Sequence, residues 1–580
     1  MLADTDNSAE GSRPGLLEKG PAVSELIAFQ IVVWSFSILA LATLLFWVGV
    51  AIGPYHLWLA LLLALAAGRY LAGNWRPWLT ATAWLAAATI AGGVALNWYY
   101  DFSGDGQWYH LPAILALAEG WNPFLAPELG QWNAGFEQGL SNAAIYVQHY
   151  AKGVWIVAAA AYRATGLLEA TKVFGLLYLL AVYLLAATFL TRVGLSRVWS
   201  HALALTAALN PVALYQLPSF FVDGQLASLS ALLILLSLDY LRRPRPQTLL
   251  LLALCVVLLV NIKFTGLVYA AVIGSAFTVV VLLRRRYVEG LRYVATGMAS
   301  LLLASALIGY QPYVSNLISK GNPFYPAVAR DKAATEATEG QFELWAPAEF
   351  LGMNRTEKLL RSLLAKSSAA KSMPEWKIPF TVSKSEMYIF FNTEPRYGGF
   401  GPFFGGILAV TLLVYMVAAR ATKAEQWKAG GGIAVLVMLS VMPNPEAWWA
   451  RLAPQLWLVP VILIAALVAG ASSWPRKVAA AMTVLLLANS ALVAALNWGR
   501  ATEKNLVFRE QMAELRAMSS SAPLQLSADP RFRMVTEHRL SAGALSYQLM
   551  EQVSCKNPLR FSYPNQPASA QAVACLASGD

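Results

Sequence analysis

Two aspartates four residues apart, Asp101 and Asp105, lie in the polar segment of the chain whose residue types best suit chemistry. The segment, residues 99–112, reads Tyr-Tyr-Asp-Phe-Ser-Gly-Asp-Gly-Gln-Trp-Tyr-His-Leu-Pro and starts where an apolar run ends. A carboxylate can take the proton from an attacking hydroxyl group, and Tyr109 and His110 offer rings that could hold a substrate. The same composition is typical of a solvated loop with interfacial aromatic side chains, and composition alone favours that second interpretation.

Two lysines lie beside or inside apolar sequence, where a charged side chain is costly to bury. Lys263 lies deep in an apolar region, and a lysine at that depth costs roughly 2.5–3.5 kcal/mol on insertion scales. A partner is therefore expected, and a phosphate group would supply the countercharge. Lys152 follows His149 and Tyr150 at the start of another apolar run. It could bind an anion, with His149 and Tyr150 contacting substrate, or it could extend to the membrane interface.

Two arginines near the ends of late apolar runs are candidates for a phosphate or pyrophosphate clamp. Arg396 and Arg451 qualify because a guanidinium group binds such oxygens with two parallel hydrogen bonds. Glu446 lies in the same segment as Arg451 and is a candidate substrate contact. Interfacial anchors would look the same from sequence, so this alternative stays open.

Composition places these residues in a membrane protein. The chain has 580 residues, of which 57% are hydrophobic and only 13% charged, and its mean hydropathy is +0.51. So little charge cannot cover a soluble domain of this size, and most of the surface must face lipid. The formal charge of +11 comes from arginines and lysines that cluster in short loops between apolar runs. Cytoplasmic loops have this character, which argues against a nucleic-acid partner.

Fourteen apolar runs are candidates for membrane crossing, since a spanning helix needs roughly 20 apolar residues. The basic loops put the polar segments 98–144, 311–399 and 498–580 on one side, the non-cytoplasmic one. Seven runs separate the first two segments, yet an even number must cross. Run 145–164, with its polar start, or run 198–215, with its Asn-Pro break, therefore fails to cross, and we expect about 13 crossings. The runs are 27–52, 56–73, 78–97, 145–164, 173–191, 198–215, 225–241, 247–262, 265–283, 290–310, 402–419, 430–442, 454–470 and 477–497.

The positions of the three cysteines indicate the redox environment of the C-terminal segment. Cys255 lies inside an apolar run and is expected to be a small core residue. Cys555 and Cys575 both lie in the polar C-terminal segment. Two thiols confined to one small segment suggest a disulfide, which needs an oxidising compartment. Two free thiols remain the alternative.

Segment 98–310 resembles the GT-C superfamily of membrane glycosyltransferases, and within it the branch of the lipid A aminoarabinose transferase and the protein O-mannosyltransferases. In that branch an Asp-Glu pair precedes a Tyr on the same helix. Here Asp105 and Gly106 stand in that position with Tyr109 following, so the resemblance maps Asp105 onto the catalytic aspartate. The neighbouring acid is absent, which leaves open whether Asp101 substitutes for it.

The resemblance also assigns roles to residues outside this motif. It implies that Lys152 and Lys263 approach the phosphate of the donor, with His149 filling part of the place of a missing acid. Asp223 matches an aspartate of positioning role, and a helix N-cap explains that residue equally well. A divalent cation, Mg²⁺ or Mn²⁺, bridging Asp101 or Asp105 to the phosphate is left open.

These observations predict an all-α polytopic membrane protein, GT-C-like, in three parts. Residues 1–26 form a cytoplasmic tail, residues 27–497 the transmembrane domain, and residues 498–580 a small extracytoplasmic α/β domain. The expected location is the inner membrane, with the active site facing the periplasm. The chain carries no P-loop, Rossmann glycine fingerprint or zinc-ligand spacing, which suits a lipid-linked donor.

The predicted activity is transfer of a sugar from a polyprenyl-phosphate donor to a hydroxyl group of a glycan, lipid or protein acceptor, with inversion. Asp105 would act as base, and Lys152, Lys263 and one arginine would stabilise the departing phosphate. A transporter or flippase of lipid-linked sugars is the first alternative, but such proteins show repeats with paired broken helices. A non-catalytic assembly protein is the second, and it leaves the costly Lys263 unexplained.

Overall fold

The chain folds mainly into apolar helices, because backbone groups inside a bilayer must form their hydrogen bonds within one segment. The computed structural model describes residues 21–129, 141–326, 346–421, 425–470, 473–520, 523–529, 532–550, 553, 559–561 and 572–576. Eight helices of this part are long and apolar enough to cross a membrane, and four shorter apolar helices accompany them. The eight belong to α1 (Val23–Trp47), α2 (Tyr55–Ala72), α3 (Trp75–Asn97), α7 (Val173–Arg192), α10 (Asp223–Arg242), α12 (Phe264–Leu283), α13 (Tyr287–Leu302) and α21 (Ser473–Ser519). The four are α11 (Pro246–Val260), α18 (Phe404–Ala421), α19 (Glu425–Val441) and α20 (Leu458–Gly470).

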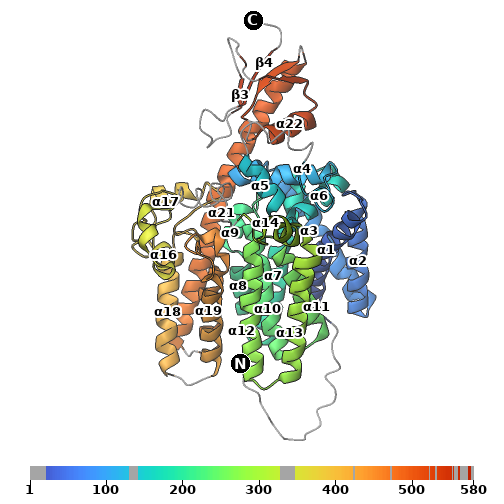
Figure 1. The fold of residues 1–580 in the computed structure, drawn as a ribbon. Coiled ribbons are helices and arrows are strands. Elements are labelled where there is room, and N and C mark those ends of the chain that lie inside the picture. Colours follow the sequence, from blue (N-terminus) through green and yellow to red (C-terminus); the bar gives the residue numbers. More distant parts are fainter. Residues whose placement is uncertain are drawn as a thin grey trace.

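These helices form one bundle with a small sheet domain beyond one of its two ends, which we call the domain end (Figure 1). The direction of α7 shows which loops lie there. Lys172, just before α7, donates a hydrogen bond to the carbonyl oxygen of Tyr99 at the end of α3. Arg192, the last residue of α7, pairs with Glu25 in the first turn of α1. The start of α1 and the end of α7 therefore share the opposite end of the bundle.

Run 145–164 does not cross the bundle. It forms α5 (Ser141–His149) and α6 (Gly153–Thr165), and the chain on both sides of α6 contacts the domain end. Before α6, Lys152 donates to Gln311, and after it the turn η3 (Glu169–Lys172) contacts Asp101. Figure 1 shows α5 and α6 beside the domain end.

Run 198–215 crosses as a broken pair of helices. The pair consists of α8 (Arg197–Ala208) and α9 (Pro211–Gln216). Asn210 interrupts the helical run and caps α9 by accepting a hydrogen bond from the backbone N–H of Val212. The described part of the chain therefore holds eight helices long enough to span a membrane, four shorter apolar helices and this broken pair, and the number of crossings stays a prediction.

The predicted polar segments gather at the domain end as far as the structure describes them. The short elements of this end are η1 (Gly106–His110), α4 (Leu111–Ala118), η4 (Leu303–Ile308), η5 (Tyr310–Val314), α14 (Ser315–Lys320), η6 (Ala348–Gly352), α16 (Arg355–Leu363), α17 (Lys384–Ile389), η7 (Ala450–Leu452) and η8 (Pro454–Trp457).

The C-terminal domain is a four-stranded sheet packed on the end of α21 and on α22 (Arg533–Ala542). Its strands are β1 (Leu524–Ser527), β2 (Tyr547–Leu549), β3 (Leu559–Phe561) and β4 (Ala572–Leu576), in the order β2-β1-β4-β3. β1 runs parallel to β2 and antiparallel to β4. The predicted boundary at residue 498 falls inside α21, whose amphipathic last turns supply Phe508, Met512 and Leu515 to the core of the domain.

The structure describes two of the three cysteines. Cys255 is a free, buried thiol in α11. Cys575 is disulfide-bonded and buried in β4. Its predicted partner, Cys555, lies outside the described residues, so the pairing itself stays a prediction.

Candidate active site

Asp105 lies at the point where the chain turns from α3 into η1. It is the N-cap residue of η1, a wide helical turn of a kind that often occurs at functional sites. One oxygen of its carboxylate, Oδ2, accepts a hydrogen bond from the Tyr109 hydroxyl at 3.3 Å and from Nη1 of Arg451 at 3.0 Å. The sequence motif and a loop more than three hundred residues further along the chain therefore meet at this carboxylate.

Arg451 is the centre of the charged cluster. It lies in η7, between α19 and α20, and its Nη1 is 3.0 Å from Asp105 and 3.6 Å from Asp223. Its Nη2 is 2.9 Å from Glu394. Burial disfavours the charged guanidinium, but the three carboxylates outweigh this effect and hold the pKa of Arg451 well above its usual value. One guanidinium thus forms ion pairs with three carboxylates.

Lys263 and Asp223 form the second ion pair of the cluster, at 2.9 Å. Lys263 precedes α12 in extended conformation, at the break after α11, and Asp223 is the first residue of α10. The Asp223 carboxylate is fully buried and also accepts a hydrogen bond from Nε2 of Gln216 at 3.2 Å. Removing one partner of such a buried pair costs about 3–5 kcal/mol, because the other charge is left uncompensated. Asp223 is thus the intramembrane partner that the position of Lys263 demands.

A pocket lies between these ion pairs and a set of aromatic side chains. Phe221 and Trp449 face the Arg451 guanidinium, with ring centroids 5.1 and 4.5 Å from its central carbon. Tyr109 and Tyr150 close another side of the pocket with their rings in edge contact. The lining residues are Tyr109, His110, Tyr150, Ala151, Val154, Trp155, Phe221, Val222, Asp223, Ile262, Lys263 and Arg451.

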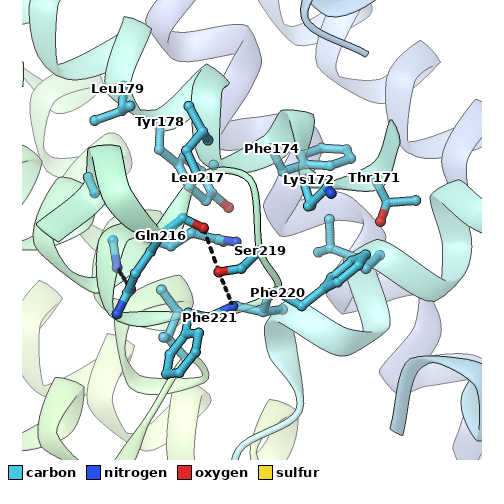
Figure 2. Close-up of a pocket in the computed structure, with 18 of the residues that line it drawn as sticks. Thr171, Lys172, Phe174, Tyr178, Leu179, Gln216, Leu217, Ser219, Phe220 and Phe221 are labelled. Atoms are coloured by element: carbon cyan, nitrogen blue, oxygen red, sulfur yellow. Dashed lines mark hydrogen bonds between the residues drawn. The ribbon is translucent and has the colours of Figure 1, made fainter. Parts of the chain in front are cut away.

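A second cavity, which we call the inner chamber, adjoins this pocket. The two share Val154, Phe221 and Ile262 as lining residues. Figure 2 shows the inner chamber, with Gln216 and Ser219 hydrogen-bonded on one wall and Phe174, Tyr178 and Leu179 above them. Its lining is largely apolar, so it suits a hydrocarbon group better than a charged one.

Glu394 is the acid that sequence reasoning missed. It stands between Thr393 and Pro395, two residues before Arg396, and its only sequence signal is its place in a polar segment just before a helix. Burial raises the pKa of Glu394 to about 7, and the Arg451 guanidinium only partly offsets this effect. Glu394 therefore takes up a proton more readily than an exposed glutamate does.

His110 stays neutral in this environment. Burial lowers the pKa of His110 to about 3, although the nearby carboxylates of Asp105 and Asp223 act in the opposite direction. Its Nδ1 accepts a hydrogen bond from the indole N–H of Trp155 at 2.8 Å. His110 can therefore shape the pocket and offer an N–H at Nε2, but it adds no positive charge to the cluster.

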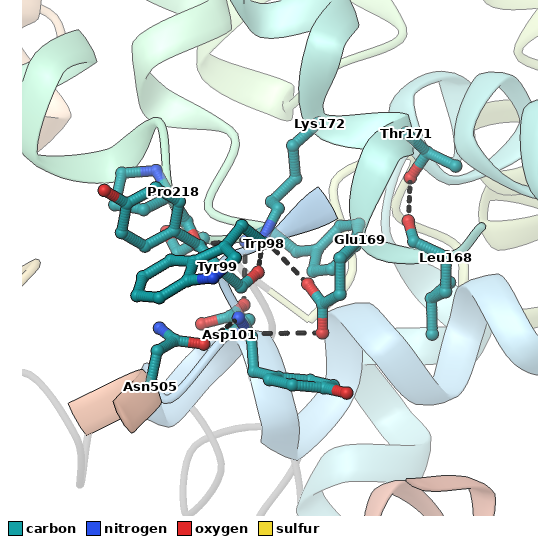
Figure 3. Close-up of polar contacts among 12 residues, drawn as sticks. Trp98, Tyr99, Asp101, Leu168, Glu169, Thr171, Lys172, Pro218 and Asn505 are labelled. Carbon is teal, nitrogen blue, oxygen red and sulfur yellow. Dashed lines mark hydrogen bonds and ion pairs between the residues drawn. The ribbon is translucent and has the colours of Figure 1, made fainter. Parts of the chain in front are cut away.

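The structure places Asp101 away from the pocket, in a connecting role. Its buried carboxylate accepts hydrogen bonds from the backbone N–H groups of Ser103 and Phe220, each at 2.7 Å. Ser103 lies in the loop that leads to Asp105, and Phe220 lies in the loop that leads to Asp223. Figure 3 shows Asp101 among the polar contacts that tie the end of α3 to η3 and to Pro218. Asp101 thus fixes the two acid-bearing turns relative to each other.

A divalent cation bridged by Asp101 and Asp105, which the sequence analysis left open, would need the two carboxylates close together. Here the Asp101 carboxylate is held by backbone N–H groups, and that of Asp105 contacts Arg451 and Tyr109. Within the described residues no group of three or more His, Cys, Asp or Glu side chains is placed to hold a metal ion. The observed arrangement of these two carboxylates therefore does not fit a bridging Mg²⁺ or Mn²⁺.

Gly106 gives a test of this geometry. A Cβ atom at Gly106 would lie 1.9 Å from Oδ2 of Asp101 and 2.3 Å from Oγ of Ser103, whereas one at Gly104 would meet nothing within 4 Å. We therefore expect Gly106→Ala to destabilise the protein by about 1–3 kcal/mol, the usual cost of overpacking. Thermal unfolding in detergent measures this, with Gly104→Ala as the matched control. Equal melting temperatures for the two variants would contradict the close contact.

Four further candidates lie outside the cluster. Buried Lys152 donates to the carbonyl oxygens of Gln148 and Tyr150 and to Gln311, so its ammonium is surrounded by neutral acceptors. The other three candidates also have partners away from the cluster. His149 bonds to Asn316, Arg396 donates to the carbonyl oxygen of Ala369, and Glu446 accepts from the indole of Trp448.

The fold and the site together define a polytopic, all-α membrane protein with a charged and aromatic pocket at its domain end. Neither a protein-family model nor a curated protein matches the chain. Among solved structures the chain is similar to ArnT from Cupriavidus metallidurans, crystallised with undecaprenyl phosphate, with 14% identity and a TM-score of 0.39 over 87% of this chain and 99% of that one. ArnT is the lipid A aminoarabinose transferase, a member of the branch that the sequence resembles. A TM-score of this size does not carry an activity from one chain to the other.

Proposed function

We propose that the protein is a GT-C-type glycosyltransferase of the bacterial inner membrane, which transfers a sugar from a polyprenyl-phosphate donor on the periplasmic side. The observation that carries the proposal is the contact of Asp105 with Arg451 at the rim of a pocket that also holds Lys263. A carboxylate for proton abstraction, two cations for a phosphate and aromatic rings thus occupy one site between membrane helices and extramembrane loops.

In the proposed reaction the acceptor hydroxyl attacks the anomeric carbon of the donor sugar. Its proton passes to the Asp105 carboxylate, and the bond between the anomeric carbon and the phosphate oxygen breaks. The electron pair of that bond stays on the phosphate, which leaves as polyprenyl phosphate. Arg451 and Lys263 stabilise the charge that develops there, and attack opposite the leaving group inverts the anomeric centre.

The ion pair of Asp105 with Arg451 would also make the base depend on the donor. A carboxylate that is bound to a guanidinium is a poor base, because proton uptake breaks the pair. An incoming phosphodiester competes for the same guanidinium, which binds phosphate oxygens with two parallel hydrogen bonds. Donor binding would therefore draw Arg451 away and free Asp105 when an acceptor can react.

The inner chamber is the proposed place for the first part of the lipid chain. It continues from the pocket behind Phe221, and its lining is largely apolar. A phosphate held by Lys263 would leave the attached hydrocarbon facing this space. Aromatic and apolar walls gain from burying such a chain at roughly 25 cal/mol per Å² of apolar surface.

The test is an assay of the purified protein in closed proteoliposomes with a panel of radiolabelled polyprenyl-phosphate sugars and candidate acceptors. A labelled product together with free polyprenyl phosphate supports the transferase. Movement of the intact donor across the bilayer without cleavage would instead favour a flippase. The assay is run with a chelator and with added Mg²⁺ or Mn²⁺, which tests the metal dependence directly.

Glu394→Gln is expected to remove a pH dependence of donor binding. Because burial raises the pKa of Glu394 to about 7, a larger fraction of this side chain is negative at pH 8 than at pH 6. The negative form competes with a phosphodiester for Arg451, so the Kd for a polyprenyl-phosphate sugar should rise as pH rises. The rise between pH 6 and pH 8 is about fivefold if the bound donor shifts the pKa of Glu394 up by one unit, and it approaches tenfold only at higher pH.

The measurement is donor affinity between pH 6 and pH 8 in wild type and in two variants. A phosphodiester does not titrate in this range, so the protein supplies any change. Glu394→Gln should give a flat profile with high affinity, and the exposed acid Glu375, replaced by Gln, should leave the wild-type profile intact. A sloping profile in Glu394→Gln would assign the titration to another group.

A further inference from the structure

The extended segment that leads to Asp105 has two faces, and they belong to two different parts of the protein. Tyr100 and Phe102 point into the C-terminal domain, where their rings lie 4.8 and 5.5 Å from that of Phe508 in α21. The alternate residues Tyr99 and Asp101 contact the bundle instead. The segment is therefore shared between the C-terminal domain and the membrane helices.

Arg539 of α22 passes from the C-terminal domain between these rings into the loop. Only 7% of its surface is exposed. Its guanidinium carbon lies 5.3 to 5.5 Å from the ring centroids of Tyr100, Phe102 and Phe508. Its nitrogens donate hydrogen bonds to the carbonyl oxygen of Asp101 at 2.7 Å and to Oε1 of Gln107 at 3.3 Å.

The two loop acceptors of Arg539 stand on either side of Asp105 in the sequence. Asp101 precedes the aspartate and Gln107 follows it, and Gln107 in turn donates to the carbonyl oxygen of Ser103 at 3.3 Å. The same guanidinium also lies 3.4 Å from Glu169, which pairs with Lys172 at the start of α7. One buried cation therefore connects α22, the Asp105 loop and the bundle.

We propose that Arg539 is a positioning residue for Asp105, and that the C-terminal domain is in this way a part of the active site. The proposal rests on the function proposed above only for the role of Asp105 in transfer. Without the guanidinium, the carbonyl of Asp101 and the amide of Gln107 lose a charged donor in a buried place, which leaves the loop free to move. The loop carries the base, whereas the cations that hold the phosphate come from other elements.

Because the base and the phosphate-binding cations lie on different elements, loss of Arg539 should affect turnover more than donor binding. Arg539→Ala should lower the turnover rate at least tenfold and change the Kd for undecaprenyl phosphate by no more than about twofold. Arg539→Lys keeps the charge but cannot form the same set of hydrogen bonds, so its turnover should be intermediate. The matched control is Arg533→Ala on the same helix, where the arginine is 35% exposed and pairs with Glu537 of the next turn.

Hydrogen exchange of the full-length protein gives a readout that does not depend on activity. Amides of residues 101–107 should lose protection in Arg539→Ala, while those of α10 and α12 keep it. If wild type transfers no sugar, the proposed function fails, but exchange still decides whether Arg539 holds the loop. If Arg539→Ala does not fold, Arg539→Lys decides both readouts. Wild-type turnover and protection in the variant that folds would overturn the proposal, as would equal loss of turnover and donor binding.

Discussion

Asp105→Asn is expected to lower the rate of sugar transfer by about 10²–10⁴-fold, the usual contribution of a general base, and to leave lipid bound. Asparagine has nearly the shape of aspartate and can still accept the hydrogen bond that the Tyr109 hydroxyl donates at 3.3 Å. It cannot take a proton from the acceptor. It also carries no charge to hold Arg451, so the guanidinium becomes more available to a phosphate group. Affinity for undecaprenyl phosphate should therefore stay the same or increase.

The measurement compares initial rates with a labelled polyprenyl-phosphate sugar and, separately, equilibrium binding of undecaprenyl phosphate. Glu375→Gln is the control, since this acid of the same extramembrane region has 74% of its side chain exposed. It should match wild type in both assays. Transfer by Asp105→Asn within a few-fold of wild type would remove the base from the proposed mechanism. Loss of binding together with transfer would make Asp105 a structural residue.

The helical membrane architecture was predictable because the length and apolarity of a run are local properties. The choice between runs 145–164 and 198–215 was not, because both are interrupted. Asn210 breaks a helix that still crosses, since α9 continues in the same direction toward the domain end. Run 145–164 stays at the domain end because contacts far away in the sequence, such as that of Lys152 with Gln311, hold both ends of α6 there.

Single site residues were predictable where a polar side chain occupies an unusual place. Asp105, Lys263 and Arg451 are of this kind, and the structure brings all three into one cluster. The pairing of these side chains was not predictable. Arg451 is 346 positions from Asp105 in sequence, and no local pattern records that contact. An arginine that anchors a helix end and one that bridges three carboxylates look alike in sequence.

The sequence did not predict the roles of residues that depend on contacts far away in the chain. Arg539 reaches the carbonyl of Asp101 across 438 positions, and nothing near it in the sequence distinguishes it from Arg533. The different roles of Asp101 and Asp105 have a similar cause. The spacing of four in the sequence does not show that the chain leaves regular structure between α3 and η1. The two carboxylates therefore point to different parts of the protein.

Arg451→Gln is expected to weaken binding of undecaprenyl phosphate about tenfold or more and to lower transfer by about 10²–10³-fold, the scale for loss of one charge-stabilising donor. It should also destabilise the protein by about 3–5 kcal/mol, because Asp105, Asp223 and Glu394 lose their common countercharge. Lys263 remains paired with Asp223, but Asp105 and Glu394 lose the guanidinium that contacts them. Thermal unfolding, lipid binding and initial rates measure the three effects on the same preparation. Arg451→Lys keeps the charge without the planar geometry, so all three should be intermediate.

A second substitution separates the structural effect of Arg451 from its chemical effect. Glu394→Gln removes one of the acids that Arg451 compensates, so the double variant with Arg451→Gln should regain part of the lost stability. It should not regain transfer, because the departing phosphate still lacks its guanidinium. Recovery of stability alone supports a direct role of Arg451 at the phosphate. Recovery of transfer as well would mean that Arg451 only neutralises its acidic neighbours, and Lys263 would then be the cation that stabilises the leaving group.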